Sequence, residues 1–415
     1  MKILGIETSC DETAVCLIEA EGDFGPPPVG GFKFRVLGNA LHSQIATHAP
    51  WGGVFPNLAK REHAKNLMPL LEVTLQQAGE LRPADDSMID HDALETLLER
   101  EPELFAALKT FLQTHGKPDI DAIAVTYGPG LEPALWVGVN FAKALSLVWD
   151  IPIVPVNHLE GHIAMAAMNL SDDISYASVS RPTERQSFGR VQKTSIAGQL
   201  HVFEFPALAL LISGGHTELD VMQEWGAFQT VGETRDDAVG EAFDKVARMV
   251  GIPYPGGAEL SRFASLARRN PGGEASRISL PRPMIHEDNC DFSFSGLKTA
   301  VRRLVAERDL SDEEKMSLAR EFEDAAADVL VKKTMRAVEE YGAQTVLVGG
   351  GVSANEYIKQ RLAASLDVPV LAPPPELATD NALMIALAGY FRALHKEFAD
   401  AETLRANGNL KLGSG

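Results

Sequence analysis

The sequence has few cysteines and no long apolar run. Its three cysteines, Cys10, Cys16 and Cys290, form neither a disulfide framework nor a zinc-ribbon spacing, which is typical of reduced thiols in a cytosolic protein. No apolar stretch reaches the roughly 20 residues that a membrane-spanning helix needs. The first residues, Met-Lys-Ile-Leu-Gly-Ile-Glu-Thr, become polar too early for a signal peptide. We therefore expect a cytoplasmic protein with no membrane partner.

Positive charge is also scarce. The 415 residues carry 38 Lys and Arg against 57 Asp and Glu, a net charge of −19. Such an acidic surface repels phosphate backbones and disfavours tight, unaided binding of nucleic acid. If the protein handles RNA, a local basic patch or a partner must supply the attraction. The length is enough for two or three domains.

The common phosphate and protease motifs, G-x-x-x-x-G-K-[ST], G-x-G-x-x-G and H-E-x-x-H, are missing. What is present is a pair of histidines, His158 and His162, directly after an apolar run at 151–156 that is typical of a buried strand. If the residues after His158 are helical, both imidazoles lie on one face and can hold one metal ion. A capped or surface pair is the alternative. The pair does not fit the H-E-x-x-H motif of a metalloprotease, because Leu159 follows His158.

The order of expected elements repeats. Three strands, then alternating helices and strands, account for 2–156, and the same order begins again at 208. We expect a first lobe at 1–157 with an insertion at 80–117 and a completing helix at 381–398. A second lobe is expected at 158–380 with a polar, partly disordered insertion at 171–200, and a tail at 399–415. This is the pattern of the actin-like, sugar-kinase and heat-shock-ATPase superfamily, a duplicated α/β fold whose two lobes face a nucleotide cleft.

Glycine-rich turns follow several of the expected strands, at 127–130, 213–217, 254–257 and 349–355. Each alone fits a tight turn, but several at strand ends favour a nucleotide site, because glycine lets backbone N–H groups approach an anion. Asp244 could hold a ribose hydroxyl. Asp380, just before the last helix, fits an N-cap; alternatively, it would complete a metal site of two histidines and one carboxylate.

These motifs, with the segments Gly-Ile-Glu-Thr-Ser-Cys-Asp-Glu-Thr at 5–13, Gly-Glu-Ala-Phe-Asp-Lys at 240–245 and Asp-Phe-Ser-Phe-Ser-Gly-Leu-Lys at 291–298, closely resemble the universal tRNA threonylcarbamoyltransferase family of the TsaD type. The likeness covers the chain apart from the two insertions and the tail. It implies an enzyme that transfers a threonylcarbamoyl group from threonylcarbamoyl-AMP to N6 of adenosine 37, in tRNAs that read codons beginning with A.

The resemblance also implies site residues and partners. It makes His158, His162 and Asp380 ligands of one divalent metal, iron(II) in most relatives and zinc or magnesium in others. It implies a paralogous inactive subunit of the TsaB type and a small ATPase of the TsaE type as partners, besides tRNA. The positions it implies for binding the adenine nucleotide of the substrate are Leu211, Ile212, Ser213, Gly214, Gly215, Asp244, Gly257 and Asn355.

No catalytic residue is expected beyond the metal site, because AMP leaves easily and needs no protein nucleophile; Cys10 is better explained as a buried thiol. One departure stands out: Asn57 replaces a glutamate usual in the family, which puts in doubt whatever contact that glutamate makes. The alternatives are a kinase or carbamoyltransferase acting on a small molecule, a non-catalytic paralogous subunit and, most remote, a peptidase.

Overall fold

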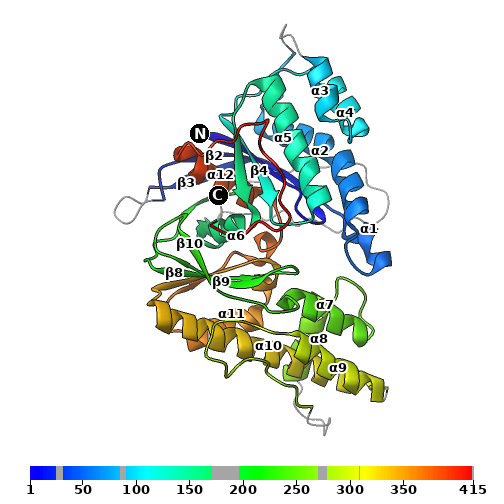
Figure 1. The fold of residues 1–415 in the computed structure, drawn as a ribbon, viewed down its shortest axis with the longest axis vertical. Coiled ribbons are helices and arrows are strands. Elements are labelled where there is room, and N and C mark those ends of the chain that lie inside the picture. The colour runs from blue at the N-terminus through cyan, green and yellow to red at the C-terminus, as the bar shows by residue number, and fades with distance from the viewer. Residues whose placement is uncertain (25–30, 85–89, 171–195, 270–277, 308, 414–415) are drawn as a thin grey trace. The chain divides into compact units, whose positions relative to one another are not determined.

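The computed structural model describes residues 1–24, 31–84, 90–170, 196–269, 278–307 and 309–413 (Figure 1). The chain divides into two compact units. Unit 1 comprises Met1–Gln44, Val54–Val202 and Asp380–Lys411; unit 2 comprises Ile45–Gly53, Phe203–Thr379 and Leu412–Gly415. Residues 158–202, which we expected to open the second lobe, therefore group with unit 1.

Unit 1 is built on a sheet of the order β5-β4-β1-β2-β3-β7-β6. β1 is antiparallel to β2 and parallel to β4, and β4 is parallel to β5. The strands are β1 (Lys2–Glu7), β2 (Glu12–Glu21), β3 (Lys33–Ser43), β4 (Ala122–Gly128), β5 (Ile153–Asn157), β6 (Met168–Leu170) and β7 (Ala197–Leu200). The helices are α2 (Pro56–Ala78), α3 (His91–Leu97), α4 (Pro102–Leu112), α5 (Glu132–Trp149), α6 (His158–Ala166) and α12 (Ala382–Leu394).

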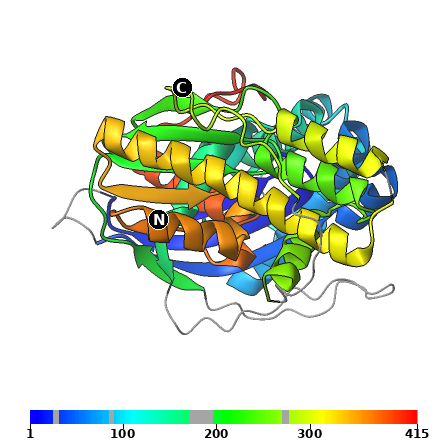
Figure 2. The same cartoon turned by 90° about the horizontal axis from the view of Figure 1, so that it is seen from below.

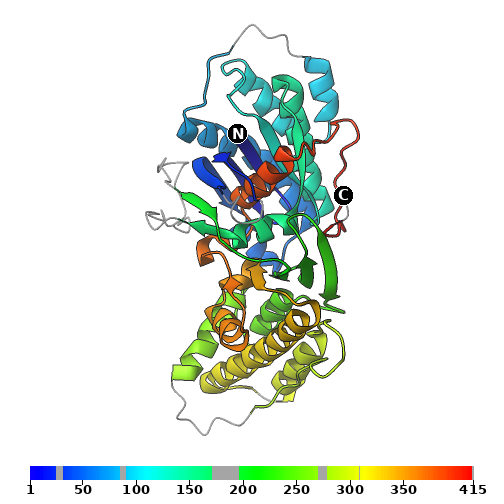
Figure 3. The same cartoon turned by 90° about the vertical axis from the view of Figure 1, so that its left-hand side faces the viewer.

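Helix α12 packs on the central strands of this sheet, as Figure 3 shows. A Cβ atom added to Gly5 in β1 would lie 2.4 Å from the carbonyl oxygen of Ala382, so only glycine permits this approach. The close contact fixes the start of α12, and with it the preceding Asp380, against β1. The core between the sheet, α2 and α5 is largely apolar, with Leu4, Leu71 and Phe141 fully buried.

Unit 2 repeats the plan with the sheet β10-β9-β8-β11-β12. Its strands are β8 (Ala207–Ile212), β9 (Thr217–Met222), β10 (Phe228–Glu233), β11 (Thr345–Gly349) and β12 (Val370–Leu371). Its helices are α1 (Ile45–His48), α7 (Val239–Met249), α8 (Gly257–Arg269), α9 (Ser295–Glu307), α10 (Asp312–Tyr341) and α11 (Glu356–Ser365), with short 3-10 turns at Ala49–Trp51, Gly351–Ala354 and Pro375–Leu377. The expected capping box of Ser311 and Glu314 opens α10, which runs along the sheet in Figure 2.

The two sheets share one connectivity, and this confirms the duplicated, actin-like α/β fold. In each, the first strand is antiparallel to the second and parallel to the fourth, and the third and fifth strands lie at opposite ends of the five. The sequence pattern of three strands followed by alternating helices and strands therefore described both units. It missed the hairpin of β6 and β7, which is paired to β3, and helix α9.

The structure describes the two expected insertions and the tail to different extents. The insertion at 80–117 contains α3 and α4, whose leucines join the core of unit 1. Most of the polar insertion, residues 171–195, lies outside the described residues. The tail is packed on unit 1: the N–H of Ala399 donates to Ile153 and that of Asn407 to Tyr127. Among the described residues, no helix has the length and apolar character to cross a membrane.

Candidate metal centre

Helix α6 starts directly at the end of β5, because Asn157 ends the strand and caps the helix. Its Oδ1 accepts a hydrogen bond from the N–H of Leu159 at 2.9 Å, which satisfies one of the free donors of the first turn. His158 and His162 are the first and fifth residues of α6 and lie on one face, with ring centroids 4.8 Å apart. Both are buried, with 6% and 2% of their surface exposed. They are not a surface pair.

Asp380 approaches this pair from the start of α12. The helix is capped by its neighbour Asn381, whose Oδ1 accepts from the N–H of Met384 at 3.1 Å. Asp380 is therefore not the N-cap. Its Oδ1 lies 3.4 Å from Nε2 of His158 and 3.2 Å from Nε2 of His162. Ligand atoms of the three residues lie within 4.8 Å of one another, so they could hold one metal ion.

The unsatisfied hydrogen-bonding capacity of this cluster fits a metal. Nε2 of His162 is buried and makes no hydrogen bond to any described residue, although Oδ1 of Asp380 is near. Such an atom is costly unless something else binds it. Ligands at about 2.1 Å from a tetrahedral ion are themselves about 3.4 Å apart, which matches the observed spacing. Two imidazoles and a carboxylate are also the donors that iron(II) and zinc accept.

The carboxylate of Asp380 and the imidazole of His158 each shift the pKa of the other. Burial works against the ionised form of Asp380, but His158 and His162 outweigh it and hold the pKa of the Asp380 carboxyl well below its usual range. Burial likewise opposes protonation of His158, yet Asp380 and Glu7 raise the pKa of that imidazole well above its ordinary value. The site thus favours a cation between the carboxylates, a proton on His158 or a metal ion.

Glu7 is a residue that we did not predict as part of the site. It ends β1, is fully buried, and places Oε2 3.3 Å from Nδ1 of His158. The hydroxyl of Thr126 donates to the same oxygen at 2.6 Å, and the N–H of Ser9 to Oε1 at 2.5 Å. A carboxylate on the far nitrogen of a ligating histidine orients the ring. The sequence feature that could have indicated Glu7 is a carboxylate that directly follows the apolar residues 3–6 of its strand.

The residues implied for substrate binding all lie in unit 2. Leu211 and Ile212 end β8 and are buried, and Oγ of Ser213 accepts from the N–H groups of Gly215 and His216 at 3.2 and 3.0 Å. Cβ atoms added to Gly214 or Gly215 would meet no described atom within 4 Å. The backbone of this turn is therefore accessible, as a phosphate or ribose site requires.

Asp244 and Asn355 have well-defined local partners. One carboxylate oxygen of Asp244 accepts from the N–H groups of Gly256 and Gly257 at 2.9 and 2.8 Å, and burial raises the pKa of Asp244. Asn355 caps α11, and its Nδ2 donates to Ser261 and Glu323 at 2.9 and 2.7 Å. Asp244 thus joins α7 to the start of α8, and Asn355 joins α11 to α8 and α10. The structure places these residues on neighbouring elements of unit 2.

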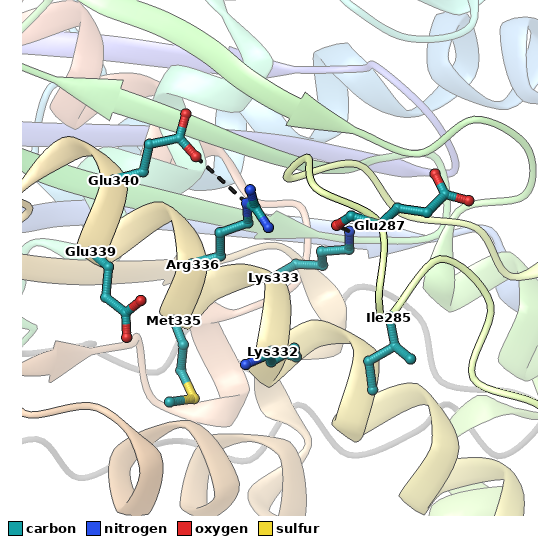
Figure 4. Close-up of a pocket in the computed structure, with 8 residues that line it drawn as sticks. All are labelled: Ile285, Glu287, Lys332, Lys333, Met335, Arg336, Glu339 and Glu340. Carbon is teal, nitrogen blue, oxygen red and sulfur yellow. Dashed lines mark hydrogen bonds and ion pairs between the residues drawn. The ribbon is translucent and has the colours of Figure 1, made fainter.

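A hollow of about 380 Å³ lies beside α10 (Figure 4). Two of its lining cations already have partners: Nζ of Lys333 donates to the carbonyls of Glu287 and Asn289 at 3.0 and 2.8 Å, and Arg336 pairs with Asp288 at 2.9 Å. None of the predicted site residues lines it. The hollow is better explained by the packing of the 285–289 loop on α10.

Comparison with known proteins gives the family of the chain. The model of the family described as tRNA N6-adenosine threonylcarbamoyltransferase (TsaD) matches residues 35–88, 102–178 and 191–387. Proteins of that name from Chromobacterium violaceum and Thermomicrobium roseum are each 38% identical to this chain, covering 99% and 97% of it and 98% and 94% of their own length. One from Burkholderia ambifaria is 39% identical over 94% of the chain and 92% of its own.

Solved structures are more distant. Full-length HypF in its phosphate- and nucleotide-bound form aligns over 96% of this chain and 56% of its own, with 12% identity and a TM-score of 0.49. The family model and the near-full-length relatives decide the assignment. The chain is a transferase and belongs to the tRNA N6-adenosine threonylcarbamoyltransferase family.

Proposed function

We propose that this protein transfers the threonylcarbamoyl group of threonylcarbamoyl-AMP to N6 of adenosine 37 in tRNAs that read codons beginning with A. The observation that carries the proposal is the convergence of His158, His162 and Asp380 in a member of this family. In the reaction a bond forms between N6 and the carbamoyl carbon, the bond from that carbon to the phosphate oxygen breaks, and AMP leaves with that electron pair. The proton that N6 loses passes to the released phosphate or to water.

We infer that His158, His162 and Asp380 hold one divalent metal ion. We expect iron(II), and zinc and magnesium are the alternatives. The ion would supply Lewis acidity toward the oxygens of the substrate. Asp380 and Glu7 would keep the region negative and orient the histidines, because each lies against the imidazole of His158. The burial of both histidines excludes bulk water, which would otherwise compete with the tRNA amine for the activated carbonyl.

The nucleotide of the substrate would bind unit 2. The accessible backbone of the turn at 213–215 would lie against the phosphate or ribose of the nucleotide, and we assign Leu211, Ile212, Asp244, Gly257 and Asn355 to the surrounding pocket. The metal-binding residues and the nucleotide-binding residues thus come from different segments of the duplicated fold.

A covalent intermediate on the protein is disfavoured. Cys10 is the thiol to consider, because Asp380 acts on it: burial, together with Asp11 and Asp380, raises its pKa well above the usual range. A thiol held in its protonated form is a poor nucleophile. Direct attack by the adenosine amine on the carbamoyl carbon is the simpler path, since AMP is a good leaving group.

The family resemblance implies partners, and the charge of the chain is consistent with them. With a net charge of −19, the surface offers little general attraction to tRNA. We infer that a paralogous inactive subunit of the TsaB type and a small ATPase of the TsaE type take part, in the cytoplasm where tRNA is modified.

The test supplies threonylcarbamoyl-AMP and unmodified tRNA to the purified chain, with and without the two partners, and measures threonylcarbamoyladenosine by mass spectrometry. A tRNA with guanosine at position 37 is the matched control. Product that requires adenosine 37 supports the proposal. No product with any combination of partners, or modification of a small molecule without tRNA, would overturn it.

A further inference from the structure

Glu160 lies between the two histidines on α6 and is almost completely buried, with 1% of its side chain exposed. Its Oε2 accepts a hydrogen bond from Nε of Arg392 at 2.7 Å and forms an ion pair with Nη2 of the same guanidinium, also at 2.7 Å. Arg392 lies near the end of α12, the helix that begins directly after Asp380. The ion pair therefore joins the helix that carries the histidines to the helix that follows the carboxylate.

A second contact joins the same helices near the other end of α12. A Cβ atom added to Gly161 would lie 3.0 Å from Cδ1 of Ile385 and 3.1 Å from Cγ of Met384. The absence of a side chain at Gly161 lets α6 lie close to the first turn of α12. The pair of Glu160 and Arg392 fixes the helices about two turns further along α12. The two contacts lie at different heights along α12 and come from adjacent residues of α6, so together they restrain the position of α6 against α12.

Stability alone is a weak explanation for this ion pair. Removing two charges from water costs about as much as their attraction returns, and apolar residues of the same volume often serve as well. What a buried, charge-assisted hydrogen bond adds is a defined geometry. Arg392 is held further by Glu397 at 3.0 Å, so its guanidinium has little freedom. This geometry matters most where ligands from both helices must meet one ion.

We propose that the ion pair of Glu160 and Arg392 sets the distance of His158 and His162 from Asp380, and that both are positioning residues of the metal centre. The inference rests on the proposed function, in which these three residues bind a metal. A shift of α6 against α12 by a fraction of an ångström changes the distances from each Nε2 to Oδ1, now 3.4 and 3.2 Å. Metal affinity is sensitive to such changes.

The experiment titrates the full-length protein with Co²⁺, whose visible absorption reports the number and geometry of its ligands, and uses three kinds of variant. Glu160→Gln removes the negative charge of the pair. Arg392→Lys keeps the positive charge but loses the planar set of guanidinium donors. It is also the milder change, for the case that Glu160→Gln does not fold. Glu101→Gln is the matched control: its carboxylate is 1% exposed and pairs with Lys60 at 3.0 Å in the same unit. His158→Ala removes a ligand.

We expect Glu160→Gln and Arg392→Lys to weaken Co²⁺ binding about tenfold or more, as supporting residues of metal sites do, and to change the visible spectrum. Glu101→Gln should lower the melting temperature without changing either measurement. Wild-type affinity and spectrum in Arg392→Lys and in a folded Glu160→Gln would overturn the inference alone. Absence of Co²⁺ binding by the wild type, or unchanged binding by His158→Ala, would instead overturn the metal centre of the proposed function.

Discussion

Oε2 of Glu7 lies 3.3 Å from Nδ1 of His158, on the side of the imidazole opposite Asp380. The imidazole thus lies between two carboxylates. Glu7 faces Nδ1, and Asp380 faces Nε2, the nitrogen that would bind the metal. This contact gives Glu7 a role in orienting the imidazole of His158.

We predict that Glu7→Gln weakens metal binding about 10- to 100-fold, because an amide fixes the orientation and basicity of a ligating histidine less well than a carboxylate. The variant should fold, since the amide oxygen can still accept from the N–H of Ser9 while the amide N–H donates to the hydroxyl oxygen of Thr126. Calorimetric titration with Zn²⁺ measures the effect, and Thr126→Val controls for loss of one hydrogen bond. Equal affinity of Glu7→Gln and wild type would contradict the role.

The metal ligands themselves make a second prediction. His158→Ala or Asp380→Ala should abolish formation of threonylcarbamoyladenosine while the fold remains intact, because each removes one of three ligands from a centre that needs all of them. Mass spectrometry measures the product and far-ultraviolet circular dichroism the fold. Unchanged product in both variants would remove the metal from the mechanism.

The position of the two histidines in the fold could be predicted from the sequence. The imidazole pair followed an apolar strand, so its helix and its place at a carboxyl end of a strand were predictable from local patterns. The convergence of Asp380 with the pair was not, because it depends on how α12 packs on β1 through Gly5, a contact between residues more than 370 positions apart. It came instead from the family resemblance.

Other features had no local signal. Asn381, rather than Asp380, caps α12; both residue types are good caps, so the sequence could not choose between them. Glu160 and Arg392 look like ordinary polar positions on two helices until packing brings them together. The tail at 399–411 has little regular structure, so its contacts with β4 and β5 were not predictable.

The tail gives a third prediction. Leu404 is 7% exposed and lies in the core of unit 1, while its carbonyl accepts from Nζ of the buried Lys143 at 2.8 Å. Leu404→Ala should lower the free energy of unfolding by about 2–4 kcal/mol, the range for a leucine removed from a core. Leu147→Ala, at a position 49% exposed, should change it by less than about 0.5 kcal/mol. Urea denaturation measures both, and equal effects would show that the tail does not stabilise unit 1.

The last prediction concerns pH. Asp220 in β9 is fully buried, and burial, with a contribution from Glu233, raises its pKa from 3.8 to about 6, although the hydroxyl of Thr230 at 2.6 Å acts in the opposite direction. Because the folded protein prefers the protonated acid, Asp220 stabilises it most below about pH 4. That contribution falls as pH rises through 6, and is then lost at a cost of about 3 kcal/mol at most.

Asp220→Asn removes this titration and keeps an oxygen for Thr230. The stability of the variant relative to wild type should therefore increase between pH 4.5 and 7.5, by up to about 2 kcal/mol. Urea denaturation at the two pH values gives the comparison. Asp312→Asn, whose side chain is 87% exposed, controls for removing one negative charge from a chain of net charge −19. A relative stability of Asp220→Asn that does not depend on pH would mean that Asp220 titrates alike in the folded and unfolded chain.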